Sequence, residues 1–313
     1  AESWLNNSAT NQTRGKILSL YLIVQMAGLI TGQALLNIGE PEGYLLFIIP
    51  SVLVSISFAP ILLSVSKGPT FEETKKMSFK RLYQASPLGF IGCFIVGAVM
   101  SGQFGMAAIY GTQIGLSIKE ISFFMSSIFV GGLCLQYPIG WISDRIDRRV
   151  LIISASVLGL LSVFAGLLLW KVYILLLAVG FFLGGVSNPL YSLLIAYTND
   201  YLDPDDMTAA SGGLIFITGL GAVIGPLFFG WLMFNFGPSG FWLSFVFLFS
   251  AIALYAGFRI TQRQSQFSIE EDDYEPVSYA NIGFSSTQVV GEVAQDFYVD
   301  NIEDSEALDG NVS

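Results

Sequence analysis

GWISDRIDRR, residues 140–149, separates two long apolar segments of this chain. Five of its last six residues are ionisable, whereas the apolar segments on either side carry almost no charge. Gly140 permits two helices to approach closely at a tight turn, and the Asp144 carboxylate is placed to face a helix N-terminus. The arginines of the stretch, Arg145, Arg148 and Arg149, are typical of a cytoplasmic loop. Taken alone, the stretch is equally compatible with a solvated basic turn that only fixes the membrane topology.

The composition of the chain excludes an ordinary soluble globule. Of its 313 residues, 53% are hydrophobic and 12% are charged, and the mean hydropathy is +0.64. A helix needs roughly 20 apolar residues to span a bilayer. The sequence therefore predicts an all-α, polytopic transmembrane helical bundle with eight spans, near residues 15–36, 43–66, 88–111, 121–142, 150–169, 173–198, 209–235 and 240–260.

The basic residues predict the orientation of the chain, because cytoplasmic loops of membrane proteins collect Lys and Arg. With residues 1–14 inside, 12 of the 14 basic residues face the cytoplasm, and only Lys119 and Lys171 lie outside. Both ends of the chain are then cytoplasmic. All five tryptophans fall at or near the expected span ends, where interfacial anchors are common.

The order Gly-x-aliphatic-small-Asp-Arg-x-x-Arg-Arg between two spans resembles the signature loop of the major facilitator superfamily of secondary transporters. Ile142 and Ser143 stand where Leu and Ala are usual, and Asp147 replaces the usual Gly. Within the superfamily, the chain looks most similar to the YcaD-like branch, through ESWL near its start and NPLYSLLIAYTND before residue 201. The resemblance covers residues 1–262, and the positions that match the loop are Gly140, Asp144, Arg145, Arg148 and Arg149.

The resemblance implies two six-helix halves, of which the first four helices are missing here. An internal repeat supports two halves in the same orientation. The first copy of the repeat is Glu2–Leu5 followed by a span with two glycines four residues apart. The second copy is Asn199–Leu202 followed by another span with two glycines at the same spacing. The expected organisation is the end of the amino-terminal half, a cytoplasmic linker, a complete carboxy-terminal six-helix half and an acidic tail, at residues 1–66, 67–87, 88–262 and 263–313. For the linker we expect a solvated connector, with an amphipathic segment against lipid headgroups as the alternative.

The resemblance also implies a conformational latch and a sliding helix interface. In the latch, Asp144 is expected against the N-terminus of the first span, near residues 13–15, and Arg148 is expected to pair with Asp200. Small residues four positions apart are common wherever membrane helices pack closely. The expected packing positions are Gly28 and Gly32, which are followed by Gln33, and Gly221 and Gly225, which are followed by Pro226.

Polar side chains within the spans are costly unless they face protein or water. Gln103 and Tyr110 are seven residues apart, a spacing that predicts one helical face. Such residues either line a substrate cavity between the halves or make ordinary interhelical hydrogen bonds worth about 0.6 kcal/mol each. The candidate cavity residues are Gln25, Gln103, Tyr110, Ser127, Asn188, Tyr191 and Thr218.

Several residue types are absent from the spans, and their absence limits which coupling, catalytic and metal-binding functions the spans could support. No Asp, Glu, Lys or Arg lies deep in a span, and the chain contains no His. Proton coupling then needs groups in the missing helices, or the protein is a facilitator. Cys93 and Cys134 lie in spans without a neighbour that stabilises a thiolate, and neither zinc-ligand nor phosphate-loop spacing occurs. We therefore expect no enzyme activity, no cofactor and no metal.

The last fifty residues, 264–313, hold 12 of the 24 acidic residues and no basic residue. This composition argues against nucleic-acid binding and favours a disordered tail, although its aromatic residues could dock to a partner or to the basic linker. The sequence thus leaves two functions open. The first is a secondary transporter of a small organic solute in a bacterial inner membrane, in contact with lipid and working by alternating access. The alternative is a membrane-embedded sensor or scaffold that keeps the fold without transport.

Overall fold

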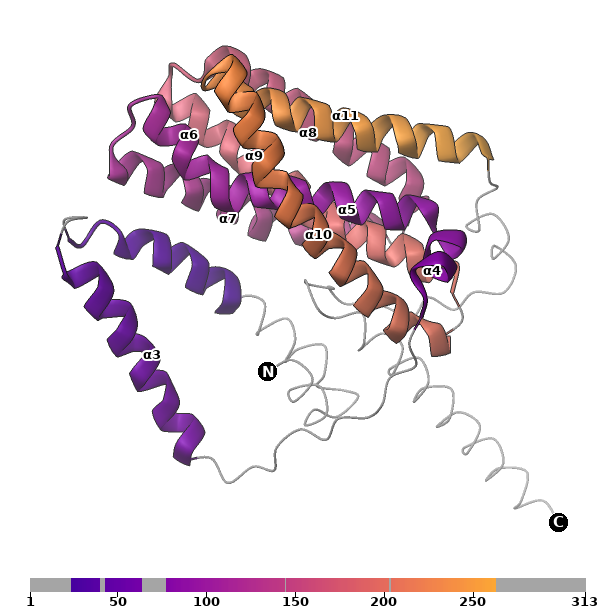
Figure 1. Cartoon of the computed structure of the whole chain (residues 1–313), viewed down its shortest axis with the longest axis horizontal. Coiled ribbons are helices and arrows are strands. Elements are labelled where there is room, and N and C mark those ends of the chain that lie inside the picture. Colours follow the sequence, from indigo (N-terminus) through magenta and orange to yellow (C-terminus); the bar gives the residue numbers. More distant parts are fainter. Residues whose placement is uncertain (1–23, 40–42, 64–76, 144, 203, 263–313) are drawn as a thin grey trace.

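The computed structural model describes residues 24–39, 43–63, 77–143, 145–202 and 204–262, and within these ranges the regular structure is helical (Figure 1). Residues 24–35 are helical, and the labelled elements follow them in chain order. They are α3 (Leu45–Leu63), α4 (Phe79–Ala85), α5 (Pro87–Ser101), the π-helix η1 (Gly102–Met106), α6 (Ala107–Gln113), α7 (Ile118–Ser143), α8 (Arg148–Leu169), α9 (Tyr173–Asn199), α10 (Pro204–Phe236) and α11 (Ser239–Gln262).

Six helices in the described ranges are long and apolar enough to cross a membrane. One of them is the continuous unit of α5, η1 and α6, and the others are α7 to α11. The prediction of a polytopic helical bundle is therefore confirmed for residues 87–262, which we call the six-helix bundle. The first two expected spans correspond to the helix of residues 24–35 and to α3, which is apolar but shorter. That these two cross the membrane stays a prediction.

Glycines allow the main helix pairs of the bundle to touch backbone to backbone. α7 packs most extensively on α9, followed by α5 on α10 and α8 on α11. A Cβ at Gly131 of α7 would lie 1.8 Å from the Phe181 carbonyl oxygen, and a Cβ at Gly184 of α9 would lie 1.9 Å from that of Ile128. No side chain fits such gaps, so the α7–α9 pair depends on small residues, as is common in membranes.

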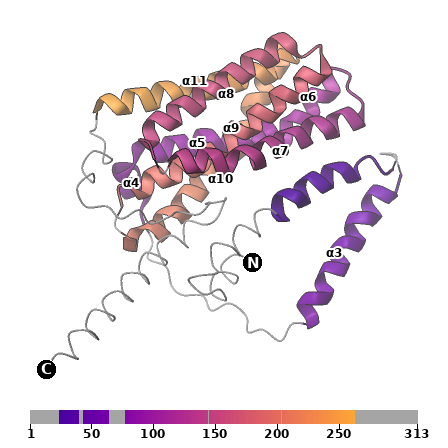
Figure 2. The ribbon, with the colours of Figure 1, turned by 180° about the vertical axis from the view of Figure 1, so that it is seen from behind.

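The segment before the bundle is only loosely packed against it. α3 diverges from the six-helix bundle in both views (Figures 1 and 2). Its apolar side chains are largely exposed: Phe47 is 74% exposed and Phe58 is 54% exposed. The preceding helix does reach the bundle, because Ile30 packs on the bundle core.

The linker contains a docked helix, so a solvated connector does not describe all of it. α4 begins after Ser78, whose hydroxyl caps the helix by accepting a hydrogen bond from the Arg81 backbone amide. The Leu82 side chain is 1% exposed and lies against Gly213 of α10. Arg81 also forms an ion pair with Asp206, which tethers α4 to the start of α10. Residues 64–76 lie outside the described ranges.

Candidate functional site

Gln103 makes a buried polar contact between η1 and α9. Its side chain is 1% exposed, and its Nε2 atom donates to Ser187 Oγ and lies 3.4 Å from the Leu183 carbonyl oxygen. The Ser187 hydroxyl donates in turn to that same carbonyl. Because the hydroxyl proton is used in this bond, Ser187 must accept from Gln103. The amide nitrogen therefore faces α9, and Oε1 points away from Ser187.

Two amide oxygens in this part of the bundle lack a partner. Gln103 Oε1 and Asn188 Oδ1 are buried and accept no hydrogen bond from any described residue. Asn188 is 5% exposed, and its amide nitrogen lies against Gly132 of α7. Leaving a buried acceptor unsatisfied costs about 1–3 kcal/mol, so both oxygens are suited to receive a donor from a solute or from water.

Both oxygens lie beside an irregularity in their helix. Gln103 is the second residue of the π-helix, and Asn188 precedes Pro189 within α9. Proline has no N–H, so Pro189 leaves the carbonyl four residues earlier without its helical donor. π-helical turns are often found at functional sites of membrane and soluble proteins. This arrangement makes the Gln103–Asn188 region the candidate solute site, and we call it the polar core.

The π-helix separates Gln103 from Tyr110. It places an extra residue in one turn and rotates the following residues by about 100° relative to an unbroken α-helix. The single face expected from the seven-residue spacing is therefore wrong. Tyr110 instead accepts a hydrogen bond from Trp242 Nε1 at 2.8 Å, and its ring stacks on Phe241 at 4.5 Å. Trp242 is 1% exposed, so it is a core residue of α11 and not an interfacial anchor.

The remaining candidate cavity residues are divided between the bundle and the segment before it. Tyr191 is 2% exposed and Thr218 is 8% exposed, and the Thr218 hydroxyl donates to the Leu214 carbonyl at 2.8 Å. Ser127 donates to the carbonyl of Phe124 at 2.7 Å within α7. Gln25 is exposed on the helix of residues 24–35. The structure thus buries most of these residues inside one bundle, and a shared cavity between two halves stays a prediction.

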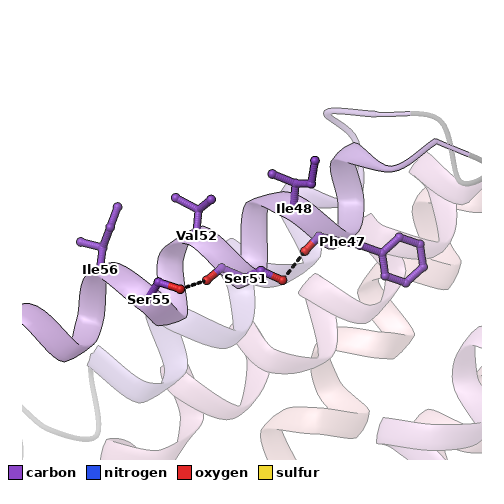
Figure 3. A pocket seen from close by; sticks show the side chains of 6 residues that line it. All are labelled: Phe47, Ile48, Ser51, Val52, Ser55 and Ile56. Carbon is purple, nitrogen blue, oxygen red and sulfur yellow. Dashed lines mark hydrogen bonds between the residues drawn. The ribbon is translucent and has the colours of Figure 1, made fainter.

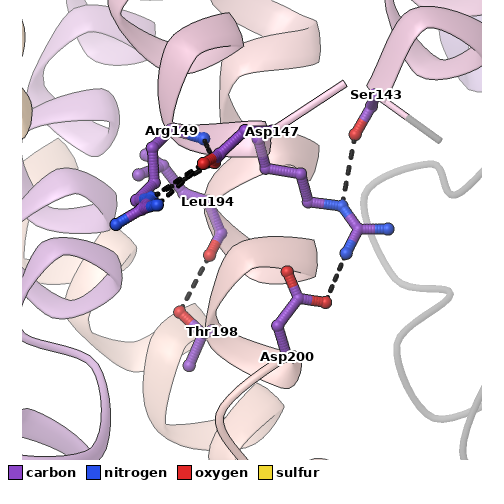
Figure 4. A network of polar contacts seen from close by, with 7 residues as sticks. Ser143, Asp147, Arg149, Leu194, Thr198 and Asp200 are labelled. Carbon is purple, nitrogen blue, oxygen red and sulfur yellow. Dashed lines mark hydrogen bonds and ion pairs between the residues drawn. The ribbon is translucent and has the colours of Figure 1, made fainter. Parts of the chain in front are cut away.

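The expected contact between Arg148 and Asp200 is present. Arg148 begins α8, its guanidinium forms an ion pair with the Asp200 carboxylate, and its Nε lies 3.3 Å from Ser143 Oγ. Ser143 ends α7 and Asp200 follows α9, and both are labelled in Figure 4. The contact joins the ends of three helices, α7, α8 and α9.

Asp147 has a role that the sequence did not indicate. Its carboxylate caps α8 by accepting from the Arg149 backbone amide at 2.9 Å, and it also accepts from the Arg149 side chain at 2.7 Å (Figure 4). Arg149 is 5% exposed, so this pair neutralises a buried cation at the start of α8. Asp147, which stands where the family motif usually has Gly, is therefore the N-cap of α8 in this protein.

The other residues of the stretch at 140–149 are only partly accounted for. The Arg145 guanidinium stacks on the Trp141 ring, 3.7 Å from its centre, and donates to the Trp141 carbonyl at 2.9 Å. Gly140 lies in the last turn of α7. Asp144 and residues 13–15 lie outside the described ranges, so the expected contact between them stays a prediction.

The two glycine pairs differ in their surroundings. A Cβ at Gly221 would lie 1.9 Å from the Phe94 carbonyl oxygen, and one at Gly225 would lie 2.0 Å from Ser101 Oγ, so α10 presses directly on α5. Pro226 follows within the same helix. At Gly28 and Gly32, no described atom lies within 4 Å of such a Cβ. The expected close packing is therefore present at the second pair only.

A wide concavity of about 480 Å³ lies along α3 but does not resemble a solute site (Figure 3). All of its lining residues come from this one helix: Phe47, Ile48, Ser51, Val52, Ser55 and Ile56. The two hydroxyls are used inside the helix, because Ser51 donates to the Phe47 carbonyl at 2.7 Å and Ser55 to the Ser51 carbonyl at 2.8 Å. The remaining lining is apolar and suits contact with lipid.

Metal-binding groups do not gather in the part of the chain that the structure describes. No cluster of three or more His, Cys, Asp or Glu occurs there. Cys93 is buried in α5 and Cys134 is exposed on α7, and both are free thiols.

Several important partners were missed from the sequence. Ser187, Trp242 and Asp147 each complete a contact of a residue that the sequence did single out. The available signals in the sequence were that Ser187 is a polar residue next to Asn188, that Trp242 lies near a span end and that Asp147 is a carboxylate before a helix. None of these signals specifies a partner that lies far away in the sequence.

Comparison with known proteins agrees with this architecture. The model of the Major Facilitator Superfamily matches residues 89–291, which extends past residue 262, where the resemblance was expected to end. An uncharacterized MFS-type transporter of Enterobacter sp. (strain 638) is 28% identical over 262 residues, covering 81% of this chain and 65% of the relative. The uncharacterized MFS-type transporters YcaD of Escherichia fergusonii and of Escherichia coli O9:H4 are each 27% identical, with the same two coverages. The chain thus spans about two thirds, 65%, of the length of these relatives. The chain belongs to the Major Facilitator Superfamily, and within it the chain is YcaD-like.

Proposed function

We propose that this protein is a secondary transporter that moves a small organic solute across the membrane by alternating access. The observation that carries the proposal is the pair of buried, unpartnered amide oxygens of Gln103 and Asn188 in the polar core. In a membrane-spanning bundle such groups are costly and are commonly retained where a solute is bound. Family membership supports transport but does not specify the solute.

The chemistry of the polar core favours an uncharged solute with hydrogen-bond donors. The two unpartnered atoms are acceptors, and the spans around them carry no ionisable residue that could neutralise a charged solute. Polyols, hexoses, neutral amides and nucleosides fit this description. A carboxylate or phosphate solute fits poorly, because acceptor oxygens would repel it.

The domain organisation and cellular location are part of the same proposal. We assign residues 1–66 to the end of one half, 67–87 to the linker, 88–262 to the other half and 263–313 to a cytoplasmic tail. Both ends lie in the cytoplasm of a bacterial cell, and the spans lie in its inner membrane. The relatives are enterobacterial proteins, and the basic loop at 145–149 supports this orientation.

Solute counterflow in sealed liposomes tests the proposal. The natural full-length protein is reconstituted and assayed with radiolabelled hexoses, polyols, neutral amides and nucleosides against protein-free liposomes. We expect saturable flux of one of these solute classes. Gln103→Leu should raise the KM for that solute about five- to tenfold through the loss of one hydrogen bond.

Gln136→Leu is the matched control, because Gln136 donates to Ser192 at 3.1 Å and its oxygen is not one of the unpartnered atoms. Its KM should stay within about twofold of the natural protein's. An absence of flux with every solute class would instead favour the sensor or scaffold.

A further inference from the structure

The helix of residues 24–35 ends with a carbonyl that its own backbone does not satisfy. The Asn37 amide donates to the Ala34 carbonyl at 3.0 Å, and the Ile38 amide donates to that of Leu35 at 3.1 Å. Both bonds reach back three residues instead of four, so the last turn is tightened. The Gln33 carbonyl thereby loses Asn37 as its helical donor.

Ser122 of α7 supplies a donor to this carbonyl. Its hydroxyl donates to the Gln33 carbonyl oxygen and accepts from Asn37 Nδ2 at 3.0 Å. The same Asn37 nitrogen lies 3.2 Å from the Ala34 carbonyl oxygen and 3.4 Å from that of Gln33, so Asn37 caps its own helix while it contacts α7, and the Ser122 hydroxyl is the closer donor to Gln33. Ser122 is 1% exposed. A buried serine of the bundle therefore completes the cap of a helix that lies more than eighty residues earlier in the chain.

The contact lies at the end of the bundle opposite the basic loop. α7 has 26 residues and is about 39 Å long, with Ser122 in its second turn and the loop at 145–149 just beyond its other end. The charge distribution places that loop in the cytoplasm, so the contact faces outside. A crevice of about 240 Å³ adjoins it, lined by Leu36, Asn37, Gly39, Ile118 and Lys119.

The surroundings suit a contact that opens and closes. α3, which follows the capped turn, leaves the bundle (Figures 1 and 2), so the segment before the bundle is held mainly at this outer end. At a membrane surface, water can replace the Ser122 hydroxyl on the Gln33 carbonyl when the helices separate. The cap therefore adds a modest preference for the closed arrangement without locking it.

We propose that Ser122 and Asn37 form an outer gate, in which the cap donated by α7 holds the segment of residues 24–39 against the six-helix bundle when the outer face is closed. The role as a gate rests on the proposed transport, whereas the contact and its effect on accessibility do not. Ser122 and Asn37 are positioning residues, since neither belongs to the polar core.

The test measures the outer accessibility of a cysteine at Ile30, which packs on the bundle core. The full-length protein carries Ile30→Cys with Cys93→Ala and Cys134→Ala in sealed liposomes of known orientation. A membrane-impermeant maleimide is then added outside. Ser122→Ala and Asn37→Ala should each raise the labelling rate about five- to tenfold, because each removes one or two hydrogen bonds of the cap. Since both substitutions act on one contact, the labelling rate of the double variant should exceed that of Ser122→Ala by less than about twofold.

Ser126→Ala is the matched control, one turn further along α7, and should leave the rate unchanged. An unchanged rate in Ser122→Ala would overturn the gate. Size-exclusion profiles verify folding, and exposed Asn37 provides the second variant if Ser122→Ala does not fold. Increased labelling without solute flux would support the contact and its effect on accessibility but would count against transport, and with it against the role as a gate. Flux without increased labelling would count against the gate alone.

Discussion

Gly221 offers a test of the α5–α10 interface in which the sign of the effect is informative. Replacing Gly by Ala inside a helix ordinarily stabilises it by about 0.8–1.0 kcal/mol. At Gly221 the added Cβ would lie 1.9 Å from the Phe94 carbonyl oxygen and 3.1 Å from the Ala98 amide nitrogen. Both distances are shorter than 3.4 Å, at which ordinary van der Waals contact begins. The first atom is backbone, so relief requires the two helices to separate by about 1.5 Å.

The expected cost is that of overpacking a tight core, about 1–3 kcal/mol, which outweighs the gain in helix propensity. The same separation would also loosen the close backbone contact at Gly97, where an added Cβ would lie 2.0 Å from the Thr218 carbonyl oxygen of the same interface. The net loss is then up to about 2 kcal/mol, which corresponds to a fall in apparent Tm of up to about 8 °C.

Gly219→Ala is the matched control on the same helix, because no atom of the described residues lies within 4 Å of its added Cβ. Fluorescence-detected size exclusion after heating compares the two variants with the natural protein at one heating rate, since membrane proteins unfold irreversibly. Gly219→Ala should be unchanged or slightly more stable. The packing account would be refuted if Gly221→Ala survived heating as well as Gly219→Ala.

Two further predictions concern polar contacts of the bundle. Asp147→Ala removes both the cap of α8 and the carboxylate that pairs with the 5%-exposed Arg149, so it should lower stability by about 2–3 kcal/mol. Asp200→Ala, from a more exposed ion pair, should cost under about 1 kcal/mol, and equal shifts in apparent Tm would contradict this ranking. Trp242→Phe leaves the buried Tyr110 hydroxyl without the Trp242 donor and should lower stability by about 1–3 kcal/mol. Adding Tyr110→Phe should recover part of that loss in a double-mutant cycle, and simple additivity of the two stability changes would count against the hydrogen bond.

The positions of the six bundle helices could be predicted from the sequence because hydropathy alone determines them. The main difference in a boundary is at α10, which begins at Pro204 instead of the expected residue 209. Pro204 and the acidic residues after it are favourable in a first helical turn, but their polarity hides the turn from a hydropathy reading. The pair of Arg148 and Asp200 was also foreseen, through the latch that the resemblance to the family's signature loop implies.

The details of the candidate site could not be predicted in the same way. No residue pattern announces the π-helix at Gly102–Met106, and its register shift separates Gln103 from Tyr110. The bond from Trp242 to Tyr110 joins residues 132 positions apart, and the cap that Ser122 donates depends on how the segment of residues 24–39 meets α7. Such contacts arise from tertiary packing, which one sequence does not specify residue by residue.

Alternating access itself is tested most directly by labelling the polar core from each face of the membrane. The full-length protein carries Asn188→Cys, with Cys93→Ala and Cys134→Ala, in sealed vesicles of either orientation exposed to an impermeant maleimide. Asn188 is 5% exposed in the present structure, so reaction requires the bundle to open towards one side. Alternating access predicts labelling of Asn188→Cys from both faces, and Ser122→Ala should raise the outer labelling rate and lower the inner one. Labelling from one face only, or from neither, would contradict it.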